Sequence, residues 1–170
     1  ESGIRMIEFK KAILASGSRR RELPALPLDH KRIINSADAL NLIAIPKRLV
    51  IVGGGYVTVE MANMFSKFGS KVSIVYRGER LLKLLEPEAT NLLEKRLMDG
   101  GIDIFFKSEI KSVKDNEITI TSPLGEKRIG FDRLLIAIGR VPELEGIGLE
   151  NTRVKIGQDE SVIVDEACKT

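Results

Sequence analysis

The chain has 170 residues, of which 43% are hydrophobic and 30% are charged, and its formal net charge is +3. This composition is typical of a folded domain, and no run approaches the roughly 20 apolar residues that a membrane-spanning helix needs. The positive charge is scattered apart from Arg19–Arg21, and only 5% of the residues are aromatic. We therefore expect neither a membrane nor a nucleic acid as a partner.

Cysteine and histidine contribute little to the expected chemistry. The chain has one cysteine, Cys168, and one histidine, His30. They offer no internal disulfide, no metal site and no Cys-His catalytic pair. The first residues, 1–4, lack an initiator methionine and a signal-peptide pattern, which predicts a piece of a longer chain. We expect a cytoplasmic location because cysteine is scarce and a signal is missing.

The first 45 residues are expected to form a linking segment. Within Ile4–Leu14, two short apolar alternations predict strand, and the small residues Ala15–Ser18 predict a turn. From Arg19 to Pro46 prolines and polar residues interrupt the pattern. Ser36–Leu42 predicts one short helix that is capped by Ser36.

The most informative stretch is Arg48–Glu60, where an apolar β-branched run precedes Gly53-Gly54-Gly55 and a helical pattern follows. The run predicts a buried parallel strand, and the helix is expected to end near Gly69. Lys71–Tyr76 predicts a second strand, which completes a β-α-β unit of roughly 30 residues. Glycines in such a turn let backbone N–H groups approach an anion, and the helix dipole favours its charge. A pyrophosphate is the expected ligand.

One position departs from the glycine fingerprint of dinucleotide-binding turns. Its third glycine or alanine is replaced by Thr58, which is larger and β-branched. We expect either a helix that lies slightly farther from the strand or a Thr58 hydroxyl that bonds to a nearby carbonyl.

The remaining core is expected to contain one more helix, a third strand and a meander. Glu86–Glu88 predicts a helix start with proline in the first turn, and Gly100-Gly101 predicts its end. Ile102–Phe106 predicts the third strand, and Arg133–Arg140 predicts a buried strand that ends in glycine. Short antiparallel strands are expected at residues 110–113, 118–121 and 127–129. The predicted fold class is α/β, with a Rossmann-like βαβ parallel sheet and an antiparallel β-meander.

Three ordered motifs resemble the pyridine nucleotide-disulfide oxidoreductases: Ala15–Ser18, Pro46–Val57 and Ala137–Pro142. The whole chain is similar to the central NAD(P)H-binding domain of this family, which implies a fold of the FAD/NAD(P)-binding domain type. The resemblance implies three parts, namely residues 1–45 linking from an FAD domain, 46–140 as the NAD(P)-binding core and 141–170 returning to the FAD domain.

The subfamily stays open at this point. Leu23–Ile34 is most similar to dihydrolipoamide dehydrogenases, whereas Tyr56–Glu60 and Tyr76-Arg77 look more like glutathione reductases. The family passes a hydride between a nicotinamide and FAD and then acts on a dithiol or disulfide substrate through a Cys-x-x-x-x-Cys pair. This sequence lacks that pair, so the resemblance implies that the chain alone binds without turnover and that the full-length enzyme is a homodimer. An NADH oxidase or ferredoxin reductase relative, and a non-catalytic dinucleotide sensor, are the alternatives.

The resemblance also implies the binding residues, and it places no catalytic residue in the chain. Gly53–Thr58 would hold the pyrophosphate, Tyr56 would shield the nicotinamide pocket, and Glu60 would lie beside the nicotinamide or only stabilise the helix start. Ser16, Gly17 and Ser18 match a loop that contacts FAD. The implied NAD(P) contacts are Gly53, Gly54, Gly55, Tyr56, Val57, Thr58, Glu60, Tyr76, Arg77, Arg80, Lys83, Ile110 and Gly139.

The choice between NADH and NADPH depends on the end of the second strand. NAD sites carry an acid there, which bonds to the ribose 2′-hydroxyl, but this chain has Tyr76 followed by Arg77. Arg77, Arg80 and Lys83 would attract a 2′-phosphate through charge-assisted hydrogen bonds. We therefore expect NADP, with the alternative that Arg77 is a solvated charge and Glu79 neutralises part of the field. The similarity to dihydrolipoamide dehydrogenases favours NAD instead.

Overall fold

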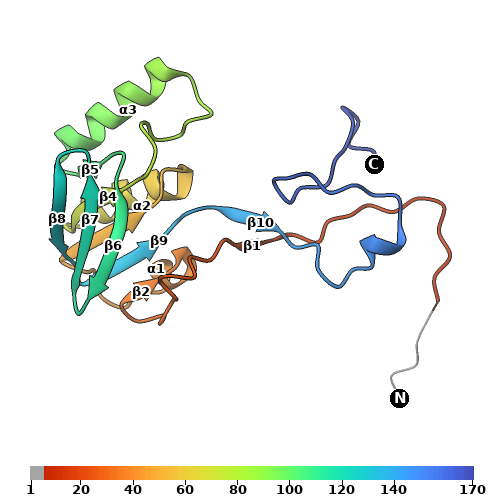
Figure 1. Cartoon of the computed structure of the whole chain (residues 1–170), viewed down its shortest axis with the longest axis horizontal. Coiled ribbons are helices and arrows are strands. Elements are labelled where there is room, and N and C mark those ends of the chain that lie inside the picture. The colour runs from red at the N-terminus through yellow and green to blue at the C-terminus, as the bar shows by residue number, and fades with distance from the viewer. Residues whose placement is uncertain (1–5) are drawn as a thin grey trace. The chain divides into compact units, whose positions relative to one another are not determined.

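The computed structural model describes residues 6–170 (Figure 1). The chain divides into two compact units. The larger unit is Arg21–Gly139, and the smaller one combines residues 6–20 with Arg140–Thr170. None of the helices in the described part is long and apolar enough to cross a membrane.

A five-stranded parallel sheet forms the centre of the larger unit (Figure 1). Neighbouring strands are parallel throughout, and Ile51 lies opposite both Leu135 and Ile74. The predicted β-α-β unit is confirmed, because β3 and β4 pair as neighbours with α2 (Tyr56–Lys67) between them in the chain. The strand order is β2 (Ile33–Ile34), β9 (Arg133–Ile136), β3 (Arg48–Val52), β4 (Lys71–Val75) and β5 (Asp103–Phe105).

Both faces of this sheet are covered, because successive side chains of a strand point to opposite sides. Ile51 belongs to a core cluster with Phe65 of α2 and Leu97 of the next helix. The adjacent Val50 belongs to a second cluster with Ile118 of the meander. Helices therefore cover one face of the sheet, and the meander covers the other.

The predicted meander is confirmed as a three-stranded antiparallel sheet (Figure 1). Its strands are β6 (Glu109–Lys114), β7 (Glu117–Ser122) and β8 (Gly125–Gly130). The pairing of β6 with β7 shifts register between Ile110 and Ser112. A bulge of this kind bends the strand locally.

The second long helix is also confirmed. It is α3 (Pro87–Asp99), with proline in its first turn and Gly100 as its C-cap. The short helix α1 (Ser36–Leu40) is two residues shorter than expected, and its cap is Asn35 rather than Ser36. Asn35 Oδ1 accepts from the backbone N–H groups of Ala37 and Asp38, while Asp38 accepts from the Asn35 N–H. This reciprocal capping box explains why the cap moves one residue toward the N-terminus.

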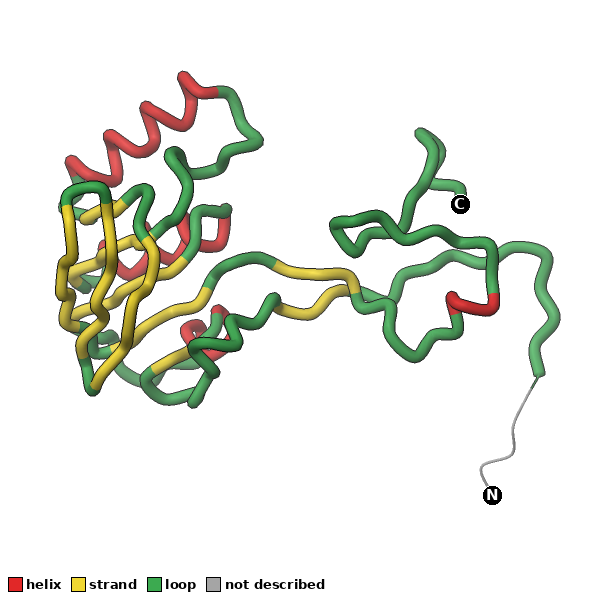
Figure 2. Tube along the Cα trace, in the orientation of Figure 1, coloured by secondary structure: helices red, strands yellow, loops and turns green. Residues whose placement is uncertain are grey.

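The strand prediction in the first residues is wrong for the part that the structure describes, since residues 6–17 form no strand. Ile4 lies outside the described residues. The strand there is β1 (Ser18–Arg20), which pairs antiparallel with β10 (Arg140–Pro142). The predicted buried strand at 133–140 ends at Ile136, because Gly139, with φ of 112°, turns the chain before β10. Most other residues of the smaller unit are loops and turns, apart from the 3-10 helix η1 (Leu149–Asn151) (Figure 2).

Candidate functional site

The strands β3, β4 and β9 end beside one another at the glycine loop, which we define as residues 53–55. The Gly53 N–H donates to the Val75 carbonyl at 3.0 Å, and the Ala137 N–H donates to the Val52 carbonyl at 2.8 Å. Gly53 has φ of 143°, and a Cβ there would lie 2.8 Å from the carbonyl carbon of Ala137. Only glycine combines this conformation with so close an approach.

The start of α2 presents backbone N–H groups to an external acceptor. Gly55 is the N-cap, and no side chain caps this helix. Val59 is the first residue of the helix whose N–H has an acceptor in the described chain, the Gly55 carbonyl at 3.2 Å. A Cβ on Gly55 would meet nothing within 4 Å. The free N–H groups of residues 55–58 and the helix dipole together favour a phosphate at this point.

The Thr58 side chain is fully buried behind the glycine loop. Its Oγ1 has no hydrogen-bond partner among the described residues, so the second of the two expected alternatives, a bond to a nearby carbonyl, is not formed. A Cβ on Gly53 would lie 2.8 Å from this oxygen. Thr58 therefore occupies the space that a smaller residue leaves free in the usual fingerprint.

The segment after β4, residues 76–86, is the loop that carries the predicted cations, and we call it the cationic loop. Backbone hydrogen bonds hold this loop to the glycine loop and to β5. The Leu82 N–H donates to the Gly54 carbonyl at 2.8 Å, and the Tyr76 N–H donates to the Phe105 carbonyl at 2.9 Å. A Cβ on Gly54 would lie 2.5 Å from the Tyr76 ring. Gly54 is thus required by the packing of Tyr76, as well as by the turn.

The three cations of this loop differ in their contacts. Arg80 donates through Nη2 to the carbonyls of Lys83, at 2.9 Å, and Leu85, at 3.3 Å, so its guanidinium helps to hold the loop. Arg77 and Lys83 are exposed, and the described residues offer no ion-pair partner to either side chain. These two charges are the ones that remain available to an anionic ligand.

Glu79 was the acid expected to weaken the positive field. Its Oε1 lies 2.7 Å from Nζ of Lys107, in the turn after β5. The hydrogen bond and charge of this ammonium hold the pKa of Glu79 below its ordinary value. The negative charge of Glu79 is therefore balanced by Lys107 rather than by Arg77.

A hollow of about 480 Å³ opens beside the cationic loop. Asn91 of α3 contributes to its lining, and its amide offers both donors and an acceptor. Neither Asn91 nor Gly78 was predicted from the sequence. The spacing of apolar residues in α3 does not indicate which distant loop the helix faces, so the sequence does not show that Asn91 and the cationic loop line one hollow. The lining residues are Tyr76, Gly78, Glu79, Arg80, Lys83 and Asn91.

The other predicted NAD(P) contacts lie on α2, on the meander and after β9. On α2, Tyr56 is 62% exposed, Glu60 is exposed and Val57 is half-buried. Ile110 is half-buried in β6. Gly139 is exposed, and its carbonyl accepts from the Arg21 N–H at 3.0 Å.

The residues expected to contact FAD, Ser16, Gly17 and Ser18, belong to the smaller unit and are exposed. Ser18 accepts from Arg140 Nε through its hydroxyl at 2.8 Å, and its carbonyl accepts a second bond from the same guanidinium. The Gly17 carbonyl accepts from the Glu143 N–H at 3.0 Å. Protein contacts thus hold this loop, while its side chains stay accessible.

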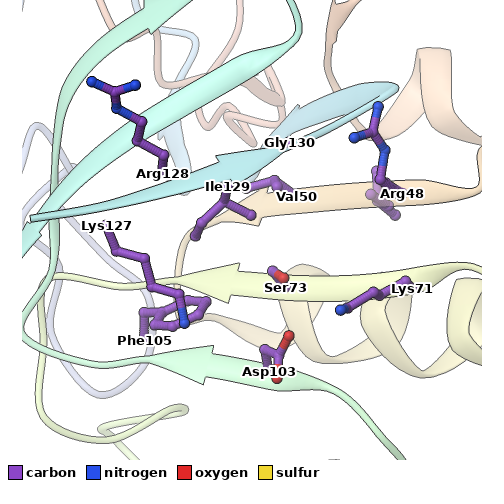
Figure 3. A pocket seen from close by; sticks show the side chains of 11 residues that line it. Arg48, Val50, Lys71, Ser73, Asp103, Phe105, Lys127, Arg128, Ile129 and Gly130 are labelled. Atoms are coloured by element: carbon purple, nitrogen blue, oxygen red, sulfur yellow. The ribbon is translucent and has the colours of Figure 1, made fainter.

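A second hollow, of about 240 Å³, lies between β8 of the meander and the strands β3, β4 and β5, and it includes the first residues of these three strands (Figure 3). Two of its cations, Arg48 and Lys127, are engaged by the protein. Arg48 contacts Asp132 at 2.8 Å, and Lys127 lies 4.5 Å from the centroid of the Phe105 ring. Ligands of open parallel sheets bind at the carboxyl ends of the strands, so we do not assign the dinucleotide to this hollow.

The sequence profile described as pyridine nucleotide-disulphide oxidoreductase matches residues 2–170. The chain belongs to this family. A dihydrolipoyl dehydrogenase of Geobacillus stearothermophilus is 36% identical over 166 residues, which are 95% of this chain and 35% of that protein. One of Pseudomonas aeruginosa is 35% identical over 169 residues, which are 99% of this chain and 36% of that protein. The chain therefore spans about a third of the length of these relatives.

Solved structures agree with this membership in the oxidoreductase family. LpdA from Mycobacterium tuberculosis gives a TM-score of 0.76 at 26% identity, over 88% of this chain and 33% of that one. The HOCl-induced flavoprotein disulfide reductase RclA from Escherichia coli gives 0.72 at 30% identity, over 89% of this chain and 35% of that one. The predicted fold class is confirmed. Among the described residues, no group of three or more His, Cys, Asp or Glu side chains is arranged to hold a metal.

Proposed function

We propose that this chain is the nicotinamide-dinucleotide-binding domain of an FAD-dependent disulfide oxidoreductase, most similar to a dihydrolipoamide dehydrogenase. The observation that carries the proposal is the set of free backbone N–H groups at residues 55–58, located where three parallel strands end. A pyrophosphate fits this arrangement because it brings two negative charges to the positive end of a helix. The family membership and the dehydrogenase relatives support the same assignment.

In this proposal the residues of the chain bind and orient the cofactor. The nicotinamide, when bound, supplies or accepts a hydride. Residues 53–58 hold the pyrophosphate, Tyr56 shields the nicotinamide pocket, and Glu60 accepts a hydrogen bond from the carboxamide. The backbone at Ile110 and Gly139 lies close to the nicotinamide nucleotide. Hydride exchange with FAD, contacts of Ser16–Ser18 with FAD, and the dithiol or disulfide substrate belong to the whole protein and are part of the proposal.

We further propose that the cofactor is NADPH rather than NADH. Arg77 and Lys83 are exposed cations without described partners, and Glu79 is engaged by Lys107. A 2′-phosphate would gain charge-assisted hydrogen bonds at this place, each contributing about 1.5 to 3 kcal/mol. No carboxylate at the end of β4 is available to select the 2′-hydroxyl of NADH.

Titration of the chain with NADPH and with NADH at moderate salt tests this preference. We expect Arg77→Ala to weaken NADPH binding about tenfold and to leave NADH binding within about twofold, because a lost bond of about 1.4 kcal/mol changes affinity tenfold. Arg128→Ala is the matched control, since Arg128 is a 77% exposed arginine of the meander. Equal or tighter NADH binding that Arg77→Ala does not change would contradict the preference.

Motifs that this sequence does not contain distinguish the possible subfamilies. A Cys-x-x-x-x-Cys pair in the parent chain before Glu1 would support a disulfide reductase of the dihydrolipoamide dehydrogenase or glutathione reductase type. Its absence would favour an NADH oxidase-like or ferredoxin reductase-like flavoenzyme, and a parent without an FAD motif would favour a dinucleotide sensor. The homodimer, the cytoplasmic location and the domain limits at residues 45 and 140 stay predictions.

A further inference from the structure

Glu94 of α3 is a buried acid that the proposed cofactor contacts do not use. Glu94 is only 8% exposed. Burying a carboxylate is unfavourable unless a hydrogen-bond donor contacts it. Oε1 of Glu94 accepts from the backbone N–H of Leu81 at 2.7 Å. Leu81 itself is fully buried, and it lies in the cationic loop between Arg80 and Lys83.

The bond from Leu81 is one of several that fix the cationic loop, whose first residues are held by the N–H groups of Lys107 and Ser108 through the carbonyls of Gly78 and Tyr76. The next N–H, that of Leu82, donates to the Gly54 carbonyl at 2.8 Å. Consecutive N–H groups are therefore held by α3 on one side and by the glycine loop on the other. Residues 76–86 contain no helix or strand, so such contacts, rather than a regular hydrogen-bond pattern, determine the conformation of the loop.

We propose that Glu94 is a positioning residue for cofactor selection: by holding the Leu81 N–H, it keeps Lys83 in place, beside the separately anchored Arg77, for the 2′-phosphate of NADPH. This inference rests on the proposed NADPH-binding function. Affinity for a ligand rises when the binding groups are already ordered, because less entropy is lost on binding. The contribution of Glu94 is therefore specific to the phosphate that distinguishes NADPH from NADH.

Two substitutions distinguish the effect of the bond to Leu81 on cofactor selection from the effect of the charge of Glu94. Glu94→Gln and Glu94→Met both remove the negative charge, but only glutamine keeps an oxygen that accepts from the Leu81 N–H. Methionine has a similar length and suits a buried site. We expect Glu94→Met to lower the ratio of NADPH affinity to NADH affinity about tenfold, and Glu94→Gln to retain it within about threefold. Glu88→Met, at an exposed position of the same helix, is the control and should leave the ratio unchanged.

A second measurement needs no nucleotide. Hydrogen exchange of single amides reports local opening, and we expect the Leu81 and Leu82 amides to exchange about tenfold faster in Glu94→Met than in Glu94→Gln. Amides of β3 and β4 should exchange equally in both variants if the fold is intact. This readout fails or succeeds independently of the wild-type titration with NADPH and NADH, which tests the proposed function.

Three results would overturn the role of Glu94. One is unchanged exchange at Leu81 in Glu94→Met. Another is faster exchange with an unchanged affinity ratio. The third is an equal loss of NADPH and NADH affinity, which would indicate a structural role alone.

Discussion

Gly54 and Gly55 are adjacent glycines with different physical requirements. At Gly54 an added Cβ would lie 2.5 Å from the Tyr76 ring, whereas at Gly55 it would meet nothing within 4 Å. The backbone of Gly55 is extended, with φ of −89° and ψ of −176°, which any residue adopts. Packing therefore requires the first glycine, whereas the packing of the described residues leaves room for a side chain at the second.

Substitution of these glycines by alanine should separate stability from binding. We expect Gly54→Ala to lower the free energy of unfolding by about 1 to 3 kcal/mol, because the Tyr76 ring must move. Gly55→Ala should change it by about 1 kcal/mol or less and yet weaken NADPH binding, since the methyl group occupies the path of the pyrophosphate. Urea unfolding and nucleotide titration of both variants check this. A Gly54→Ala protein as stable as the wild type would refute the packing role, and unchanged binding by Gly55→Ala would refute the ligand role.

The elements differ in how much of them the sequence could predict. The unit β3-α2-β4 carries long apolar patterns and a glycine turn, and it was predicted closely. β2 was missed because a strand of two residues, Ile33 and Ile34, shows no alternation. The cap of α1 was misplaced because Asn35 and Ser36 are both good caps, and only the bond from Asp38 distinguishes them.

The candidate site was predictable where it depends on local sequence, as in the glycine loop. Its tertiary contacts were not. The bond between Glu94 and Leu81 joins residues 13 positions apart, and the pairing of Glu79 with Lys107 joins two separate loops. No sequence period encodes such contacts, because they depend on how α3 and β5 pack beside the cationic loop.

An ion pair joins the start of β3 to the turn before β9 and should make stability depend on pH. Asp132 accepts from the Arg48 guanidinium at 2.8 Å and from the Arg48 N–H at 2.9 Å, and the side-chain bond from Arg48 holds the pKa of Asp132 below its ordinary value of 3.8. A lowered pKa in the folded state means that Asp132 stabilises the fold above pH 3.8 and loses this effect as the pH falls through its folded pKa.

We expect Asp132→Asn to destabilise the protein by about 1 kcal/mol or less at pH 7, because both partners are partly exposed. The difference from the wild type should shrink as the pH falls below 3.8, where the wild-type carboxyl becomes protonated. Urea unfolding of both proteins over a pH series measures it. A difference that stays constant down to acidic pH would show that the charge of Asp132 makes no contribution.

For the whole chain, the division into two units separates the residues of the two proposed cofactor contacts. It spans about a third of its dihydrolipoyl dehydrogenase relatives, and its larger unit contains the glycine loop, the cationic loop and α3 together. The smaller unit contains the residues proposed to contact FAD. We therefore expect the proposed dinucleotide binding to be measurable on this chain, because the glycine loop and the cationic loop belong to the same unit.

Nucleotide binding at the glycine loop can be mapped on the chain by the shifts of its backbone amide resonances. With NADPH, we expect the largest shifts at Gly55–Thr58, whose N–H groups would bond to the pyrophosphate, and further shifts along the cationic loop. Shifts confined to the hollow around Arg48 and Lys71, or no shifts at millimolar nucleotide, would contradict this expectation.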